Sequence, residues 1–244
     1  VFLLISIALA HWAIRPVEQA WKQQRQFVAD ASHDLKTPLT VIMTNAELAQ
    51  SPDYDEEGRQ RFLSSILTMS RQMRGLIEEM LQLARADQAD TKAAFAPVDF
   101  SKLTSDALLP FEPIFFEAGL TLSSAISDAI QVTGNDVQLR QVVEILLDNA
   151  QKYSQPGGAT QVSLKRHRKN HCLLTVANQG EPLSPEALKH IFERFYRADQ
   201  ARSRTGSFGL GLSIAETIVT QHQGKIWAES REGRNWFYVE LPCA

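Results

Sequence analysis

The sequence predicts an α+β protein in which a long helical hairpin is followed by an α/β sandwich. The first third of the chain has almost no glycine and repeats its apolar residues at helical steps. The remainder mixes short strand patterns with helices. The chain has 244 residues, of which 44% are hydrophobic and 22% are charged. These values are ordinary for a globular protein and exclude wholesale disorder.

Charge and cysteine content exclude several classes of protein. The formal net charge is −3 and no long basic run occurs, which argues against direct binding of nucleic acid. The two cysteines, Cys172 and Cys243, form no CxxC pair. A disulfide scaffold and a cysteine zinc site are therefore not expected, and a reducing compartment fits best.

Residues 1–16 begin with the apolar run VFLLISIALA and reach their first charge at Arg15. A run of this length is shorter than the roughly 20 residues that a membrane-spanning helix needs, and it lacks the basic start of a signal peptide. We interpret it as the cytoplasmic end of a truncated transmembrane helix, with Trp12 and Arg15 as interfacial anchors. This places the chain at the cell membrane, with the rest of it in the cytoplasm. A buried or disordered tail is the alternative.

Residues 17–90 predict two amphipathic helices that are broken at Ser51–Asp53. Two helices of this length cannot bury both apolar stripes against each other alone, so we expect the hairpin to dimerise into a four-helix bundle. The stripes consist of Phe27, Ala31, Leu35, Leu39, Ile42 and Ala46, and of Phe62, Ile66, Met69, Met73, Leu76, Ile77, Met80 and Leu83.

Residues 91–97 are small and polar and predict a linker, and residues 98–244 predict a second domain. Helices are expected at 100–118, 137–153 and 210–222. Strands are expected at 120–126, 130–133, 161–166, 172–178, 225–230 and 236–241. The segment between 178 and 210 is expected to be rich in loops.

His33 is the first candidate for chemistry. It lies two residues from both Ala31 and Leu35, which is about 200° around a helix, so its ring points away from the apolar stripe. Asp34 can accept a hydrogen bond from Nδ1–H, which fixes the tautomer and leaves Nε2 as a nucleophile. Thr37 lies one turn further on, where its hydroxyl could position a water. Pro38 should bend the helix just beyond the histidine.

The stretch from Phe27 to Leu39 resembles the phosphoacceptor box of bacterial sensor histidine kinases. The resemblance implies that His33 is phosphorylated from ATP and passes the phosphoryl group to an aspartate on the receiver domain of a response regulator. It makes Asp34 the activating acid and Thr37 the residue linked to phosphatase activity toward that regulator.

Two later segments indicate a nucleotide site by their residue types alone. Asn149, Lys152 and Tyr153 share one turn of a predicted helix. An amide oxygen can ligate Mg²⁺ and a lysine can meet phosphate, although a polar surface turn explains them equally well. Gly206, Gly209 and Gly211 precede an apolar helix, where backbone amides bind anions.

Between these segments, IFERFYR carries an aromatic stripe at Phe192, Phe195 and Tyr196, which is usually packing. Arg194 and Arg197 could reach phosphate, and the small polar residues that follow suit a lid. The three segments resemble the N, F and G2 boxes of the histidine kinase ATP-binding domain, which shares its fold with gyrase-type ATPases. The resemblance implies ATP and Mg²⁺ as cofactors and Asn149 as the metal ligand.

Three positions depart from the family pattern. Ile145 stands where a polar residue is common, and Glu144 beside it should point about 100° away. The adenine-contacting box supplies Asn178 and Gly180, with Asn178 in place of aspartate and Pro182 in place of a second glycine. Asn178 can still accept a hydrogen bond from the adenine amino group. Ser207 and Phe208 also differ from the usual residues.

Two other functions remain open from the sequence. One is a degenerate, non-catalytic scaffold that binds a response regulator, which the altered adenine box motivates. The other is a gyrase-type ATPase that hydrolyses ATP, against which Ile145 argues. Intact His33, Asp34, Asn149 and Lys152 favour a dimeric kinase.

Overall fold

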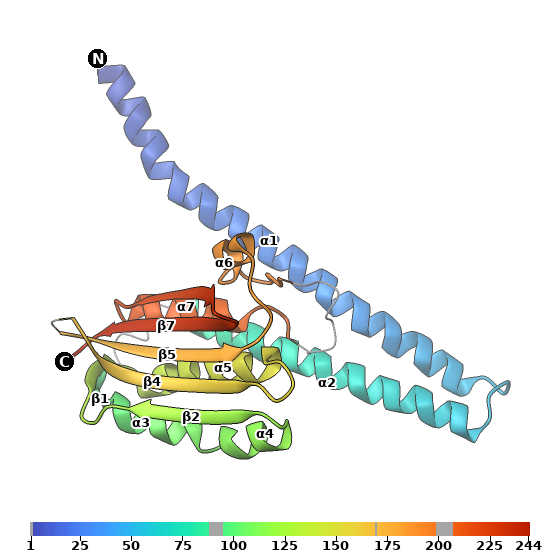
Figure 1. Cartoon of the computed structure of the whole chain (residues 1–244). Coiled ribbons are helices and arrows are strands. Elements are labelled where there is room, and N and C mark those ends of the chain that lie inside the picture. Colours follow the sequence, from blue (N-terminus) through green and yellow to red (C-terminus); the bar gives the residue numbers. More distant parts are fainter. Residues whose placement is uncertain (1, 88–94, 169, 199–206) are drawn as a thin grey trace. The chain divides into compact units, whose positions relative to one another are not determined.

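The computed structural model of the chain describes residues 2–87, 95–168, 170–198 and 207–244 (Figure 1). It divides into two compact units, Val1–Glu78 and Glu79–Ala244. The last turns of the second helix therefore belong to the second unit. We describe each unit by itself.

The first unit is the predicted helical hairpin. Helix α1 runs from Phe2 to Gln50 and continues through Pro38, and helix α2 runs from Glu56 to Asp87. Asp55 begins α2 by accepting a hydrogen bond from the backbone of Gly58 at 2.8 Å. Among the described residues, no helix combines the length and the apolar character that crossing a membrane requires.

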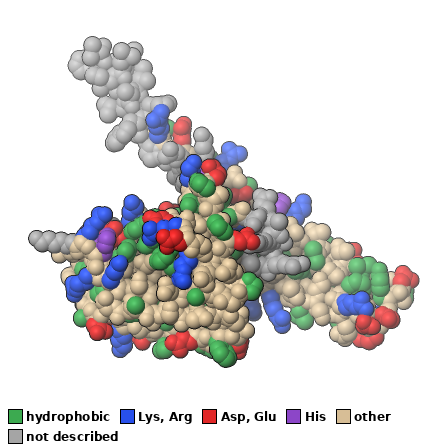
Figure 2. All heavy atoms as spheres, in the orientation of Figure 1, with side chains coloured by type: hydrophobic (Ala, Val, Ile, Leu, Met, Phe, Trp, Pro, Cys, Tyr) green, Lys and Arg blue, Asp and Glu red, His purple; other side chains and the backbone are tan. Residues whose placement is uncertain are grey.

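Apolar side chains remain at the surface of this hairpin. Figure 2 shows hydrophobic side chains gathered near its closing loop. Along the two helices, Leu39, Met43, Leu63 and Leu67 are between 46% and 57% exposed. These residues lie on or beside the predicted apolar stripes, so one copy of the hairpin leaves much of that apolar surface uncovered.

The second unit is built on a five-stranded sheet in the order β2-β4-β5-β7-β6 (Figure 1). Strand β2 pairs with β4 in parallel, and the remaining neighbours are antiparallel. The central strand β5 is buried along seven consecutive residues, as its apolar sequence predicts. The strands are β2 (Thr121–Ile126), β4 (Ala159–His167), β5 (His171–Gln179), β6 (Lys225–Arg231) and β7 (Arg234–Pro242).

Helices α3 (Phe100–Leu108), α5 (Asp136–Tyr153) and α7 (Gly211–Gln221) pack with the sheet, and α5 contacts α3, α7 and β5. Asn135 caps α5 by accepting from the backbone of Gln138 at 3.1 Å. The core contains fully buried Leu146, Leu174, Ile214 and Val239. Each such side chain contributes roughly 1.5–3 kcal/mol to stability through burial. This apolar core fixes the position of α5 on the sheet.

Three local features differ from the expectation. Strand β1 (Ala96–Asp99) pairs antiparallel with β3 (Gln131–Gly134) and begins inside the predicted linker, of which residues 91–94 lie outside the described residues. The predicted helix 100–118 is broken before α4 (Phe111–Glu117), because Pro110 cannot donate a helical hydrogen bond. The predicted loop region contains a short helix, α6 (Pro185–His190).

Candidate active site

The second unit contains a cavity of about 480 Å³ beside the C-terminal half of α5. Residues of α5, β5, α6 and the start of α7 line it, together with two residues from the end of α2. A cavity of this size and mixed polarity fits a small organic ligand. Seven of the residues predicted from the sequence to bind the nucleotide line it, namely Asn149, Lys152, Tyr153, Asn178, Arg197, Gly209 and Gly211.

Three other predicted residues are placed differently. Gly180 and Arg194 are not among the residues that line the cavity. Gly180 lies beside it, however, because a Cβ atom there would come within 2.5 Å of the Tyr153 carbonyl oxygen and 3.0 Å of Asn178 Nδ2. Only glycine fits this close approach of the strand to the end of α5. Gly206 lies outside the described residues.

The last turns of α5 present the polar groups that were expected from their spacing. The Lys152 ammonium lies 2.7 Å from the Asp148 carboxylate one turn earlier. Because an ammonium has three donors, Lys152 can keep this contact and still meet a phosphate oxygen. The carboxamide of Asn149 supplies an oxygen of the kind that Mg²⁺ prefers.

Glu144 is positioned differently from the expectation. Both Glu144 and Ile145 line the cavity, although the two side chains leave the helix about 100° apart. The cavity is wide enough to reach both. Sequence spacing alone therefore misjudged which α5 residues face it.

The glycine segment also reaches the cavity, which Gly209 and Gly211 line. Gly209 has a φ of 75°, and a Cβ atom there would lie 2.6 Å from the Tyr196 carbonyl oxygen. Its carbonyl accepts from the backbone of Phe195 at 3.0 Å, and Phe195 also has a positive φ, of 61°. The aromatic segment is thus a series of turns and not a helix. The predicted aromatic stripe does not form.

The end of α2 contributes to the cavity in a way that no sequence pattern indicated. Glu79 and Gln82 line it, and Gln82 accepts a hydrogen bond from Gln141 of α5 at 2.9 Å. Leu83 and Ala86 are buried in the same segment. Glu79 Oε2 is buried without a hydrogen-bond partner among the described residues. Burial raises the pKa of Glu79 to about 7, opposed by Lys152 and reinforced by Asp148.

This carboxyl group predicts a pH dependence of stability. The folded chain keeps a proton on Glu79 up to about pH 7, whereas an unfolded chain releases it near 4.5. Stability is therefore lost as pH rises through this interval, because the folded state binds more protons. Glu79→Gln should raise the free energy of unfolding above pH 7 by about 3 kcal/mol relative to the wild type, and should have little effect below pH 4.5.

Thermal unfolding between pH 4 and pH 8.5 measures this difference. Glu78→Gln is the matched control, since Glu78 is an exposed neighbour with a side chain that is 63% accessible. A stability gap that does not change with pH, or one shared by both variants, would contradict the buried state of Glu79.

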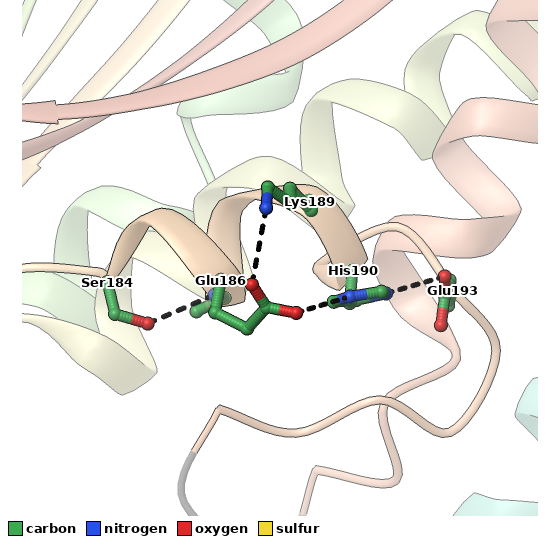
Figure 3. A network of polar contacts seen from close by, with 6 residues as sticks. Ser184, Glu186, Lys189, His190 and Glu193 are labelled. Atoms are coloured by element: carbon green, nitrogen blue, oxygen red, sulfur yellow. Dashed lines mark hydrogen bonds and ion pairs between the residues drawn. The ribbon is translucent and has the colours of Figure 1, made fainter.

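Helix α6, whose Ala187 lines the cavity, is held by a polar network (Figure 3). Ser184 caps it by accepting from the backbone of Ala187 at 3.0 Å. The two ring nitrogens of His190 lie 2.7 Å from Glu193 and 3.0 Å from Glu186. Hydrogen bonds to these two carboxylates raise the pKa of His190. The network ties α6 to the aromatic segment that follows it.

His33 belongs to the first unit. Its side chain is 82% exposed on α1, and its Nδ1 lies 3.3 Å from Asp34 Oδ1. This contact selects the tautomer in which Nε2 carries a lone pair. The hydroxyl of Thr37 donates to the His33 carbonyl oxygen at 3.4 Å. The three residues therefore share one exposed turn of the helix.

The chain thus combines a helical hairpin that carries an exposed histidine with a second unit that holds a ligand-sized cavity. The family described as the His Kinase A (phospho-acceptor) domain matches residues 23–89. The family described as histidine kinase-, DNA gyrase B-, and HSP90-like ATPase matches residues 134–244. The chain belongs to the sensor histidine kinases of two-component systems, as the resemblance of its motifs predicted.

Curated relatives agree with this assignment. The sensor protein DltS of Streptococcus agalactiae is 35% identical over 238 residues, which cover 98% of this chain and 59% of that protein. The sensor histidine kinase RppB of Synechocystis is 34% identical over 241 residues, covering 97% of this chain and 53% of that protein. The chain thus spans little more than half the length of these relatives.

Solved structures confirm the predicted fold. The catalytic domain of histidine kinase ThkA has a TM-score of 0.55 at 25% identity and covers 61% of this chain and 95% of that chain. ThkA in complex with response regulator protein TrrA has a TM-score of 0.77 at 19% identity, covering 95% of this chain and 65% of that chain. The helical hairpin followed by an α/β ATPase-type sheet is therefore the fold of this family.

Proposed function

We propose that this chain is the kinase core of a two-component sensor, which phosphorylates His33 from Mg·ATP and transfers the phosphoryl group to an aspartate of a response regulator. The observation that carries the proposal is the exposed His33 ring, oriented by Asp34 at 3.3 Å, in a chain that also holds a nucleotide-sized cavity lined by Asn149 and Lys152. Family membership supports both halves of the reaction.

In the proposed reaction, Nε2 of His33 attacks the γ-phosphorus of ATP in line. The new bond is N–P, the bond that breaks joins the γ-phosphorus to the β,γ-bridging oxygen, and ADP leaves. Asp34 stabilises the positive charge that develops on the imidazole by accepting from Nδ1. The protein otherwise positions the reactants and neutralises charge, and the cations Lys152 and Arg197 line the cavity where the phosphates would lie.

The donor set of the cavity fits Mg²⁺. Magnesium takes one or two protein oxygens and completes its six ligands with water and substrate phosphates. Asn149 supplies such an oxygen, and the carboxylates of Glu144 and Asp148 also line the cavity. When bound, Mg²⁺ would neutralise charge on the phosphates, and Asn149 would be the residue that holds it.

We further propose that the chain acts as a homodimer. Leu39, Met43, Leu63 and Leu67 of the hairpin are about half exposed, and a second hairpin that packs on them would complete a four-helix bundle.

The second proposed partner is a response regulator. ThkA, which shares the fold, has been crystallised with a response regulator. That complex supports a receiver domain as the partner of this chain.

Attachment to the membrane through residues 1–16 stays a proposal that rests on their sequence. The apolar run and the positions of Trp12 and Arg15 support it. The relatives DltS and RppB are named as sensors. A cytoplasmic position for the kinase core follows from the same proposal.

Autophosphorylation tests the proposed function directly. The purified chain is incubated with Mg²⁺ and ATP labelled with ³²P at the γ position, and the label is exposed to acid and to alkali. A phosphohistidine is lost in acid and kept in alkali. The absence of such a label on a folded dimer would contradict the kinase and favour the non-catalytic scaffold, which the altered adenine box motivates.

Thr37→Ala tests the proposed phosphatase role. Among the described residues, the Thr37 hydroxyl makes one weak hydrogen bond, to the His33 carbonyl oxygen at 3.4 Å, so its loss should leave the helix and the labelling of His33 intact. Dephosphorylation of a receiver domain that the wild-type chain has labelled should slow by about tenfold or more, because no hydroxyl then positions the attacking water. The measurement is the decay of phosphorylated receiver with each variant present.

Thr40→Ala provides the matched control. Its hydroxyl donates to the Lys36 carbonyl at 2.9 Å, one turn beyond the contact of Thr37. Equal decay rates with the wild type and Thr37→Ala would refute the role given to Thr37.

A further inference from the structure

His190, the last residue of α6, has a carboxylate at each of its two ring nitrogens (Figure 3). Nδ1 lies 2.7 Å from the Glu193 carboxylate, and Nε2 lies 3.0 Å from the Glu186 carboxylate. A carboxylate can only accept hydrogen bonds, and a neutral imidazole has a single N–H to donate. Neutral His190 can therefore satisfy one of the two carboxylates, whereas the imidazolium, which has two N–H groups, satisfies both.

The two carboxylates also favour the imidazolium. Hydrogen bonds to Glu193 and then to Glu186 raise the pKa of His190 above its ordinary value of 6.5. The imidazolium is therefore present below the raised pKa and is lost as pH rises through it. The other charged or titratable side chains on the elements around the network are Lys189 on α6, Arg194, Tyr196 and Arg197 in the segment that follows, Glu216 on α7, and Lys225, Glu229 and Arg231 on β6.

The contact with Glu193 joins α6 to one side of the cavity. We call residues 191–198 the α6 wall, and its members that line the cavity are Ile191, Tyr196, Arg197 and Ala198. The backbone of Tyr196 donates to the Glu193 carbonyl oxygen at 3.2 Å, and the Tyr196 ring lies 5.7 Å from the His190 ring. His190 thus holds both the carboxylate that begins this turn and the aromatic ring that ends it.

The α6 wall in turn contacts the glycine segment. The backbone of Phe195 donates to the Gly209 carbonyl oxygen at 3.0 Å. The fit between the two is close, because a Cβ atom at Gly209 would lie 2.6 Å from the Tyr196 carbonyl oxygen. A change in the position of the wall therefore reaches Gly209 and Gly211, which line the cavity and which we expect to lie beside the phosphates.

We infer that His190 is a positioning residue for the nucleotide cavity and that it fixes the α6 wall only as an imidazolium, so that nucleotide binding weakens as pH rises. The inference rests on the proposed function, because it takes the cavity to be the nucleotide site. When the proton is lost, a ring nitrogen lone pair faces a carboxylate and one of the two contacts opens. His190 is not among the residues that line the cavity, so it acts through Glu193 and the wall.

Calorimetric titration of the full chain with the β,γ-imido analogue of ATP and Mg²⁺, at pH 6 and at pH 9, tests the inference. At pH 6 the wild type should bind the analogue about fivefold more tightly than His190→Gln, because glutamine cannot donate to both carboxylates with a positive charge. At pH 9 the two dissociation constants should agree within about twofold. Glu79 and the phosphates titrate with both proteins, so the ratio of the two constants isolates His190.

Glu193→Gln separates a contact that needs the proton from one that is only structural. A carboxamide has a donor and an acceptor, so it can pair with Nδ1 in either form of the ring. The rise in dissociation constant between pH 6 and pH 9 should therefore be about threefold smaller in Glu193→Gln than in the wild type. His167→Gln replaces a histidine at the end of β4, outside the residues that line the cavity, and should keep the wild-type rise.

Two results would overturn the inference. One is a ratio between wild type and His190→Gln that is the same at both pH values, because the histidine would then act by its shape alone or not at all. The other is an undiminished rise in Glu193→Gln, which also decides the question if His190→Gln does not fold. Both results leave the kinase proposal standing, since the nucleotide still binds. Failure of the wild type to bind the analogue at either pH would overturn both proposals.

Discussion

Replacing His33 by glutamine is expected to abolish acid-labile phosphorylation of the chain. Glutamine has no nucleophilic ring nitrogen, so the labelling rate should fall to background, a loss of at least about 1,000-fold. The side chain is 82% exposed and its hydrogen bond is to the adjacent Asp34. The substitution should therefore change stability by no more than about 0.5 kcal/mol. The two measurements are ³²P incorporation and the sedimentation of the unlabelled protein.

The control for this substitution is His167→Gln, at the end of β4 in the second unit. It removes a histidine from the ATPase-type domain and should leave labelling unchanged. If His33→Gln keeps its label while His167→Gln loses it, then the phosphoacceptor lies elsewhere. Loss of the dimer in His33→Gln would instead assign the histidine a structural role.

Asn149→Ala should produce the second large effect. It removes the amide oxygen that we propose as the protein ligand to Mg²⁺, and alanine offers nothing in its place. Loss of a metal ligand should reduce Mg·ATP-dependent labelling by more than about 100-fold. Mutation of a residue that only hydrogen-bonds to a metal ligand already lowers metal affinity or activity by about 10–100-fold. Alanine favours helix, so α5 should remain intact.

Labelling rates measured across a range of Mg²⁺ concentrations separate metal binding from folding. Gln151→Ala is the control, two residues further along α5 and not among the residues that line the cavity. An Asn149→Ala variant that labels at the wild-type rate at every Mg²⁺ concentration would remove Asn149 from the metal site. A shared loss in both variants would indicate damage to α5 itself.

Much of the site was visible in short stretches of sequence. His33, Asp34 and Thr37 lie within one helical turn, and their contacts at 3.3 Å and 3.4 Å are local ones. Asn149 and Lys152 likewise share a turn. The relative positions of these groups depend only on the helical period, which the spacing of the apolar residues reveals in the sequence.

Other parts of the site depended on distant segments. Glu79 reaches the cavity from the end of α2, which is far along the chain from α5. Gly180 and Arg194 were predicted as ligand-binding residues, yet they do not line the cavity. The structure also showed that Asn178 is fully buried at the cavity, between β4 and β7, with no hydrogen-bond partner for its amide among the described residues.

The sequence by itself determined the order of the elements, the helical hairpin with an outward-facing histidine, and the alternation of strands and helices in the second unit. These follow from residues that are near one another in the chain, where periodicity and capping act. Only the tertiary structure decided that β1 pairs with β3 and that Glu79 and Asn178 are buried at one cavity. Burial and pairing of this kind are properties of surfaces brought together by folding, and no local pattern encodes them.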